Sequence, residues 1–187
     1  MTPAHRRVIR LLLATTALLV GLSACGGPVV LSYWGSLDGA NRLRRSAPHA
    51  GVDFGELHGG PVLAAMDGYV VWARDTQAGC GKGIGLTHAV ASPKGSRFTV
   101  YCHLDRIDVS SGDSVKRGQP VGRVGTTGNA VGVPHVHFEV SASSRSHADG
   151  DLSGTEDPEP YFVGCFDPQK TYATDKFVLT YPVQCTK

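Results

Sequence analysis

The sequence carries little charge and no concentration of charge of one sign. Charged residues make up 18% of the 187 positions, and the formal net charge is only +2. Three positive charges, Arg6, Arg7 and Arg10, fall within residues 1–24, which contain no acidic residue, and removing that segment takes the net charge to −1. Because no basic stripe remains, nucleic acid is not expected as a partner.

Long apolar runs and long helical patterns are also missing. The most apolar stretch, Leu11–Leu22, is shorter than the roughly 20 residues that a membrane-spanning helix needs. No window repeats apolar residues at helical spacing over several turns, so no long amphipathic helix is predicted. Short strands are therefore expected to build the fold.

The first 24 residues have the pattern of an export signal. A basic start precedes the apolar stretch, and the stretch ends in Leu22-Ser23-Ala24-Cys25-Gly26. This ending resembles a bacterial lipobox, in which the cysteine becomes the lipidated first residue of the mature chain. An ordinary cleaved signal peptide is the alternative, but Leu22 stands where a small residue is preferred. We expect residues 1–24 to be a lipoprotein signal, with the protein exported and anchored through Cys25 to a bacterial membrane, facing the periplasm or cell wall.

The cysteine count is odd, which is unusual for an exported protein, because five are present. If Cys25 carries lipid, four remain, and four cysteines in an oxidising compartment favour two disulfides over free buried thiols. Three pairings are possible. We favour the sequential pairing, which closes two loops of about twenty residues, each a constraint worth roughly 3 kcal/mol: Cys80 with Cys102, and Cys165 with Cys185.

Glycine-punctuated short strands dominate the middle of the chain. Asp67-Gly68 between apolar runs predicts a hairpin, because both central turn positions favour positive φ. Residues 83–88 and 98–104 alternate as strands do. An all-β fold is therefore predicted.

The domain organisation follows from these patterns. We expect residues 25–48 to form an N-terminal linker or strap and residues 49–140 to form the main domain. Residues 141–187 are expected to form a polar loop and a C-terminal extension, which packs on the domain and is held by the second disulfide. Within the first segment, residues 33–48 are either a regulatory strap over the site or a simple spacer.

Histidines and one aspartate suggest a metal site. Residues two apart in a strand face the same side, so His135 and His137 are expected to share a metal or substrate site. His49 and Asp53 add a nitrogen and a carboxylate oxygen, which Zn²⁺ accepts, and Gly51 lets the chain bend between them. Three protein ligands leave a fourth position for water, which is the arrangement of a catalytic site.

Taken in order, these motifs resemble those of the lysostaphin/LytM-type zinc metallopeptidases. The resemblance rests on His49-x-Gly51-x-Asp53, His103-Leu104, the glycine-rich run from Val115 to Gly128, and His135-x-His137-Phe138-Glu139. It covers roughly residues 49–140. Two departures lie next to the last motif: Val131-Gly132-Val133-Pro134 replaces the usual glycine-proline, and Val136 replaces the commoner leucine. Both keep the histidines in place.

The resemblance implies a fold, a site and an activity. The fold would be an antiparallel sheet core with a substrate groove, barrel-sandwich-like. One Zn²⁺ would be held by His49, Asp53 and His137, with His103 and His135 beside it as acid–base or oxyanion-stabilising groups. The activity would be that of a zinc endopeptidase acting on the peptide stems or cross-bridges of bacterial cell-wall peptidoglycan.

Two other functions are compatible with the resemblance. One is a non-catalytic family member that regulates or activates another wall hydrolase at the envelope. The other is a structural lipoprotein that binds metal incidentally. Because the chain keeps all the ligands and both flanking histidines, the enzyme is favoured.

Residues around the site carry further expectations. Cys102 and His103 are adjacent in a strand, so the Cys80–Cys102 bridge is expected behind the sheet while His103 faces the groove. Glu139 is expected to form a cross-strand ion pair, with an orienting contact to a ligand as the alternative. The remaining histidines of the mature chain, His58, His88 and His147, are expected to be solvated or packing residues.

Overall fold

The computed structural model describes residues 26–130, 132–147 and 150–185. The signal segment and Cys25 lie outside the described residues. Within them the fold is all-β, as predicted, with ten strands and one short 3₁₀ turn, η1 (Glu159–Tyr161). None of the described segments forms a helix with the length and apolarity needed to cross a membrane.

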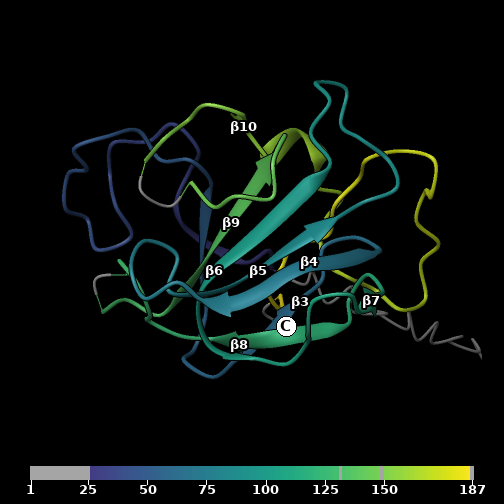
Figure 1. The fold of residues 1–187 in the computed structure, drawn as a ribbon, viewed down its shortest axis with the longest axis horizontal. Helices are drawn as coiled ribbons and strands as arrows, with labels where there is room; N and C mark the ends of the chain where they lie inside the picture. The colour runs from purple at the N-terminus through teal and green to yellow at the C-terminus, as the bar shows by residue number, and fades with distance from the viewer. Residues whose placement is uncertain (1–25, 131, 148–149, 186–187) are drawn as a thin grey trace, which may run out of the picture.

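The strands form one antiparallel sheet that folds over at one side (Figure 1). They are β1 (Val29–Ser32), β2 (Val52–Gly55), β3 (Pro61–Leu63), β4 (Gly68–Asp75), β5 (Lys82–Thr87), β6 (Phe98–Ile107), β7 (Ser114–Val115), β8 (Pro120–Val124), β9 (His135–Ser141) and β10 (Thr155–Glu156). The main order is β1-β2-β9-β6-β5-β4-β7, with β10 on β9 and with β8 linking β6 to β3. The His-x-His strand β9 therefore lies between β2 and β6.

Strand β9 separates the apolar core from the polar side of the sheet. Its alternate residues Val136, Phe138 and Val140 are wholly buried in the main core. The residues between them point to the opposite face, because side chains alternate along a strand. Those residues are His135, His137 and Glu139, which are also buried. One face of β9 thus anchors the strand in the apolar core, and the other face presents ionisable side chains that can form a site.

The C-terminal extension packs on the core of the main domain. The rings of Phe162 and Tyr181 lie 5.5 and 5.7 Å from that of Phe54 on β2, and Leu179 and Val183 are buried. Both predicted disulfides are present, Cys80–Cys102 and Cys165–Cys185. The second closes the extension on itself.

Residues 33–48, hereafter the strap, form loops that connect β1 to β2. Their backbone is tied to the chain that enters β2: Gly35 N donates to His49 O at 2.7 Å, and His49 N donates to Ser36 O at 3.0 Å. Within the strap, Asp38 and Arg44 form an antiparallel bridge. The strap therefore has a fixed place beside His49.

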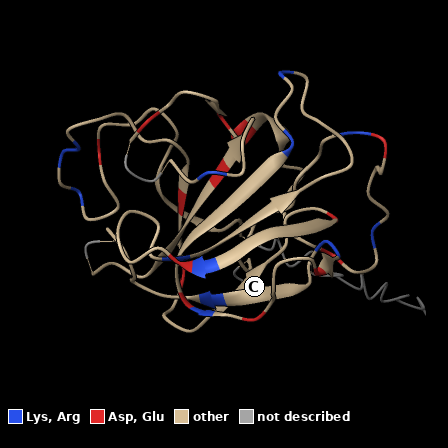
Figure 2. Ribbon diagram, viewed as in Figure 1, with Lys and Arg blue, Asp and Glu red and all other residues tan. Residues whose placement is uncertain are grey.

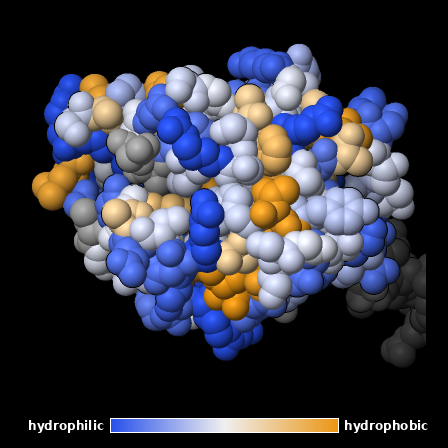
Figure 3. Space-filling model, viewed as in Figure 1, coloured by the Kyte–Doolittle hydropathy of each residue, from blue (hydrophilic) through white to orange (hydrophobic). Residues whose placement is uncertain are grey.

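The surface is polar and mixed in charge. Lys, Arg, Asp and Glu lie mostly on loops and strand ends, and both signs are interspersed on the face drawn (Figure 2). Hydrophobic residues on that face form small separate patches (Figure 3). The face drawn thus shows no broad apolar surface.

Candidate metal centre

Strand pairing brings Asp53 and His137 together. Asp53 on β2 lies directly opposite His137 on β9 in the antiparallel register. Residues opposite each other in such a pair project to the same face of the sheet. The third predicted ligand, His49, stands just before β2, and its chain passes close to β9 at Gly51. A Cβ at Gly51 would lie 2.3 Å from the carbonyl oxygen of Phe138, so glycine is needed for this approach rather than for a left-handed turn.

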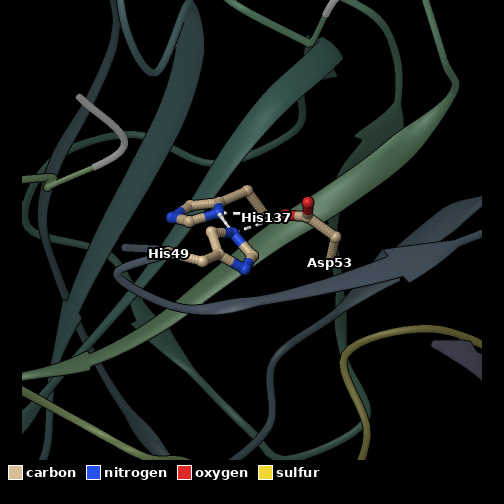
Figure 4. Close-up of side chains that lie close together, drawn as sticks. All are labelled: His49, Asp53 and His137. Carbon is tan, nitrogen blue, oxygen red and sulfur yellow. Dashed lines mark hydrogen bonds and ion pairs between the residues drawn. The ribbon is translucent and has the colours of Figure 1, made fainter. Parts of the chain in front are cut away.

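Three side-chain atoms converge where these segments meet (Figure 4). His49 Nε2 lies 2.8 Å from His137 Nδ1, and both nitrogens lie 3.0 Å from Asp53 Oδ1. All three side chains are buried. The structure thus places the three sequence-predicted ligands in one cluster.

The donor set of this cluster fits zinc. Two imidazole nitrogens and one carboxylate oxygen are ligands that Zn²⁺ prefers, at about 2.0–2.2 Å each. A triangle of donors about 3 Å on a side is close to what such bonds span, and three protein donors leave room for water. The carboxylate of Asp53 is buried beside two imidazoles, and a bound cation would compensate its negative charge. The residues present therefore fit the ion that the sequence implied.

Each histidine of the cluster has its other ring nitrogen occupied. His49 Nδ1 lies 3.1 Å from the carbonyl oxygen of Tyr33 and 3.1 Å from Ser32 Oγ. His137 Nε2 lies 2.9 Å from Glu139 Oε1. A carbonyl or carboxylate only accepts, so these nitrogens carry protons, and His49 Nε2 and His137 Nδ1 are the ring nitrogens that face the centre.

Glu139 is itself held by a loop that follows β9. The backbone N–H of His147 donates to Glu139 Oε1 and Oε2 at 2.8 and 3.0 Å, and the Nδ1 of His147 lies 3.1 Å from Oε2. The expectation of a cross-strand ion pair is wrong, because Glu139 bonds to His137 two residues earlier in its own strand. His147 is buried, not solvated. Its place depends on a loop folding back, which residue spacing does not reveal.

His103 and His135 stand beside the three donors. Their rings lie 4.8 Å apart between centroids. In each ring Nδ1 donates to a backbone carbonyl, that of Thr127 at 2.9 Å for His103 and that of Val133 at 2.7 Å for His135. Nε2 of each ring is therefore the acceptor, and that of His135 lies 3.5 Å from Asp53 Oδ1. The predicted flanking pair and the predicted ligands form one site.

His103 reaches the site by an unexpected backbone conformation. Cys102 lies directly opposite His137 in the β6–β9 register, so Cys102 is on the same face as His137 and not behind it. Regular alternation would then turn His103 away from the site. His103 instead has φ of 68°, in the left-handed region that is uncommon for residues with a Cβ. The expected placement of the disulfide behind the sheet is therefore wrong, although the pairing itself is confirmed.

Burial keeps most of the imidazoles neutral. Burial lowers the pKa of His103 to about 3, and electrostatic repulsion from the neighbouring rings of His137 and His135 acts in the same direction. Burial likewise lowers the pKa of His49 and of His135, although Asp53 opposes the shift in both. Neutral imidazoles are the forms that bind metal or accept a proton.

The carboxylates create the one exception. Burial opposes protonation of His137, but its hydrogen bonds to Asp53 and Glu139 outweigh burial and raise its pKa to about 9. Burial also disfavours the charged forms of both acids, yet the hydrogen bonds from the imidazoles hold the pKa of Asp53 well below its usual value and lower that of Glu139 to about 2. Asp53 and Glu139 are therefore negatively charged, and together they favour the protonated form of His137.

One cation at the site was not predicted from the sequence. Arg45 in the strap donates from Nη2 to Asp53 Oδ2 at 2.7 Å. Of the other histidines, His58 is about half exposed, and His88 is buried against Phe177 outside the site. The only hint for Arg45 was its closeness in sequence to His49, which does not distinguish it from Arg44.

The site opens into a cavity of about 360 Å³. One wall is the strap, and the other carries the donors and the flanking pair. The wall residues that bear on the argument are Arg44, Arg45, His49, Asp53, His103, His135 and His137. The four histidines of the site therefore line one cavity.

Comparison with known proteins places the site in a family. Residues 47–149 match peptidase family M23. The peptidoglycan DD-endopeptidase ShyA of Vibrio cholerae is 38% identical over 103 residues, which are 54% of this chain and 22% of that protein. The glycyl-glycine endopeptidase ALE-1 of Staphylococcus capitis is 38% identical over 113 residues, 60% of this chain and 28% of that protein. The chain thus spans about a fifth to a quarter of the length of such relatives.

Solved structures agree. The catalytic domain of the antimicrobial peptidase lysostaphin from Staphylococcus simulans superposes with a TM-score of 0.56 at 32% identity, covering 72% of this chain and 91% of that domain. A zinc-containing peptidase from Vibrio cholerae superposes with a TM-score of 0.53 at 30% identity, over 70% of this chain and 36% of that one. With more than half of its residues matched, and with the fold shared, the chain belongs to peptidase family M23.

Proposed function

We propose that this chain is a zinc-dependent endopeptidase that hydrolyses peptide bonds in bacterial cell-wall peptidoglycan. The observation that carries the proposal is the convergence of four imidazoles and one carboxylate in one cavity, each ring with its other nitrogen committed as a donor. The named activity of ShyA, a peptidoglycan DD-endopeptidase, supports peptidoglycan as the substrate class, and that of ALE-1, a glycyl-glycine endopeptidase, supports hydrolysis of peptide bonds.

In this proposal His49, Asp53 and His137 hold one Zn²⁺. When bound, zinc would supply a Lewis acid that polarises a carbonyl and acidifies a water molecule. Glu139 and the carbonyl of Tyr33 fix the two ligand rings, so the donors are arranged before the ion arrives.

His103 and His135 would move the protons of the reaction. Each presents an unprotonated Nε2 while Nδ1 is tied to a backbone carbonyl, so each accepts a proton at Nε2 and returns it to the leaving amine. The ring that has taken up the proton then carries an N–H at Nε2, and that N–H would donate to the oxygen that becomes negative at the scissile carbonyl before the proton passes to the leaving amine. Because the rings are buried and fixed, neither needs to reorganise first.

The cellular place of the protein belongs to the same proposal. An exported, lipid-anchored form through Cys25 would bring the site to the periplasm or cell wall, where peptidoglycan is the available polymer. The sequence pattern of residues 1–25 supports this, and those residues lie outside the described structure. Labelling with a radioactive or clickable fatty acid, compared between the wild type and Cys25→Ser, tests the anchor.

The activity is tested on purified peptidoglycan. The zinc-loaded protein should release soluble peptides and lose this activity with a chelator. His103→Ala and His135→Ala should each lower kcat by about 10²–10⁴-fold, the range of general acid–base catalysis. His58→Ala, at a half-exposed position, is the matched control and should retain full activity. Mass spectrometry of the products identifies the bond.

If the zinc-loaded wild type does not cleave peptidoglycan, a regulatory role without catalysis is favoured. A zinc-loaded protein that binds peptidoglycan or another wall hydrolase but releases nothing would point to a regulatory family member. Intact ligands and flanking histidines argue for the enzyme.

A further inference from the structure

The carboxylate of Asp53 is divided between two sets of partners. Oδ1 faces His49 Nε2 and His137 Nδ1, each at 3.0 Å. Oδ2 accepts a hydrogen bond from Arg45 Nη2 at 2.7 Å. The side chain of Asp53 is fully buried, whereas that of Arg45 is 28% exposed. The two oxygens of one ligand are thus distinguished by a residue from the strap.

The position of Arg45 is set by the strap backbone. Arg45 N donates to Leu37 O at 2.6 Å, and the preceding residue, Arg44, is bridged to Asp38. The strap is tied to His49 by two further backbone hydrogen bonds. Arg45 lies outside residues 47–149, the segment that matches the family. The contact therefore joins a residue of the strap to a residue within the matched segment, Asp53.

We propose that Arg45 is a positioning residue of the metal centre: by holding Oδ2, it leaves Oδ1 as the one oxygen of Asp53 turned toward the ion. A carboxylate with both oxygens free can bind a metal through both, which would take up the position that water needs. A guanidinium suits this task, because it is always charged and holds its N–H donors in a fixed geometry. The inference rests on the zinc site of the proposed function but not on peptide cleavage.

The neighbouring arginine separates positioning from simple electrostatics. Arg44 carries the same charge, belongs to the same strap and lines the same cavity, but its side chain is exposed. If a positive charge at the cavity wall were all that mattered, the two arginines would be equivalent. If the hydrogen bond to Oδ2 matters, only Arg45 affects the ligand set.

The test uses Co²⁺ in place of Zn²⁺, because the visible absorption of Co²⁺ reports its coordination number. Four-coordinate Co²⁺ absorbs strongly, and each added ligand weakens the bands. The variants are Arg45→Met, Arg45→Lys and Arg44→Met, each compared with the wild type at saturating Co²⁺. Circular dichroism of each metal-free variant checks that it is folded.

We expect Arg45→Met to weaken the Co²⁺ bands by roughly twofold or more, as Oδ2 joins the coordination sphere. Arg45→Lys, which keeps a donor, should stay closer to the wild type, and Arg44→Met should match it. Identical spectra for the wild type and a folded Arg45→Met would overturn the proposal, as would an equal change in Arg44→Met. Since the spectrum needs no cleavage, a wild type that binds Co²⁺ but cuts nothing would refute the proposed function and leave this inference standing.

Discussion

Glu139 Oε1 accepts a hydrogen bond from His137 Nε2 at 2.9 Å, and this single contact decides which nitrogen of the His137 ring faces Asp53. The carboxylate is wholly buried and is held from its other side by His147. A buried anion behind a ligand imidazole fixes the tautomer and raises the basicity of the ligand.

Replacing Glu139 with glutamine should therefore weaken zinc binding. The variant keeps the size of the side chain but loses the negative charge, so we expect the zinc dissociation constant to rise about 10–100-fold. Competition with a chromophoric chelator measures this change. Glu159→Gln, on the exposed η1 turn, is the matched control and should bind as the wild type does. Equal affinity in Glu139→Gln and the wild type would show that Glu139 only fills space.

Zinc binding should release a proton at neutral pH. In the metal-free protein the pKa of His137 is raised to about 9, so its ring is protonated at pH 7.5 and must lose that proton to become a ligand. Falling pH stabilises the protonated, metal-free form, so the apparent affinity should drop about tenfold per pH unit below that pKa.

Calorimetry in two buffers with different heats of ionisation counts the protons released. About one is expected at pH 7.5, and fewer for Glu139→Gln, because one of the two carboxylates that raise the pKa of His137 is then neutral and only Asp53 remains. A count of zero in the wild type would mean that His137 is already neutral before the metal binds.

The sequence predicted the donors better than their surroundings. Asp53 and His137 were identifiable because ligand chemistry restricts residue type, and β-strand alternation placed His135 and His137 on one face. Arg45 and His147 could not be identified from the sequence, because each reaches the site through a loop whose path depends on tertiary contacts. The orientation of His103 could not be predicted either. Its side chain faces the site only because its φ is 68°, a value that residues with a Cβ rarely adopt and that no sequence pattern indicates.

The two disulfides should stabilise the fold alike but affect the site differently. They close loops with sequence separations of 22 and 20, so removing either should lower the free energy of unfolding by roughly 3 kcal/mol. Only Cys80–Cys102 is next to the site, because His103 follows Cys102 and its N–H donates to the carbonyl of Cys80 at 2.8 Å.

Urea unfolding and kcat, measured on the two double alanine variants, separate these effects. We expect Cys80→Ala/Cys102→Ala to lose activity under conditions where it is still folded, through the freed backbone of His103. Cys165→Ala/Cys185→Ala, the matched control, should keep kcat at similar stability loss. Full activity in the first variant would show that the left-handed conformation of His103 is held by other contacts.

Gly51 is where the chain between His49 and Asp53 presses against β9, and alanine there should damage the site more than the fold around it. A Cβ would lie 2.3 Å from the carbonyl oxygen of Phe138 and 3.0 Å from Cε1 of His137. Because a backbone atom is in the way, β2 and β9 must separate, at a cost of about 1–3 kcal/mol in the free energy of unfolding. The same shift moves His137 away from Asp53, so the zinc dissociation constant should rise as well. Gly27→Ala is the control, since nothing lies within 4 Å of its Cβ position. If Gly51→Ala bound zinc and unfolded like Gly27→Ala, the close approach of the two segments would not be what assembles the donors.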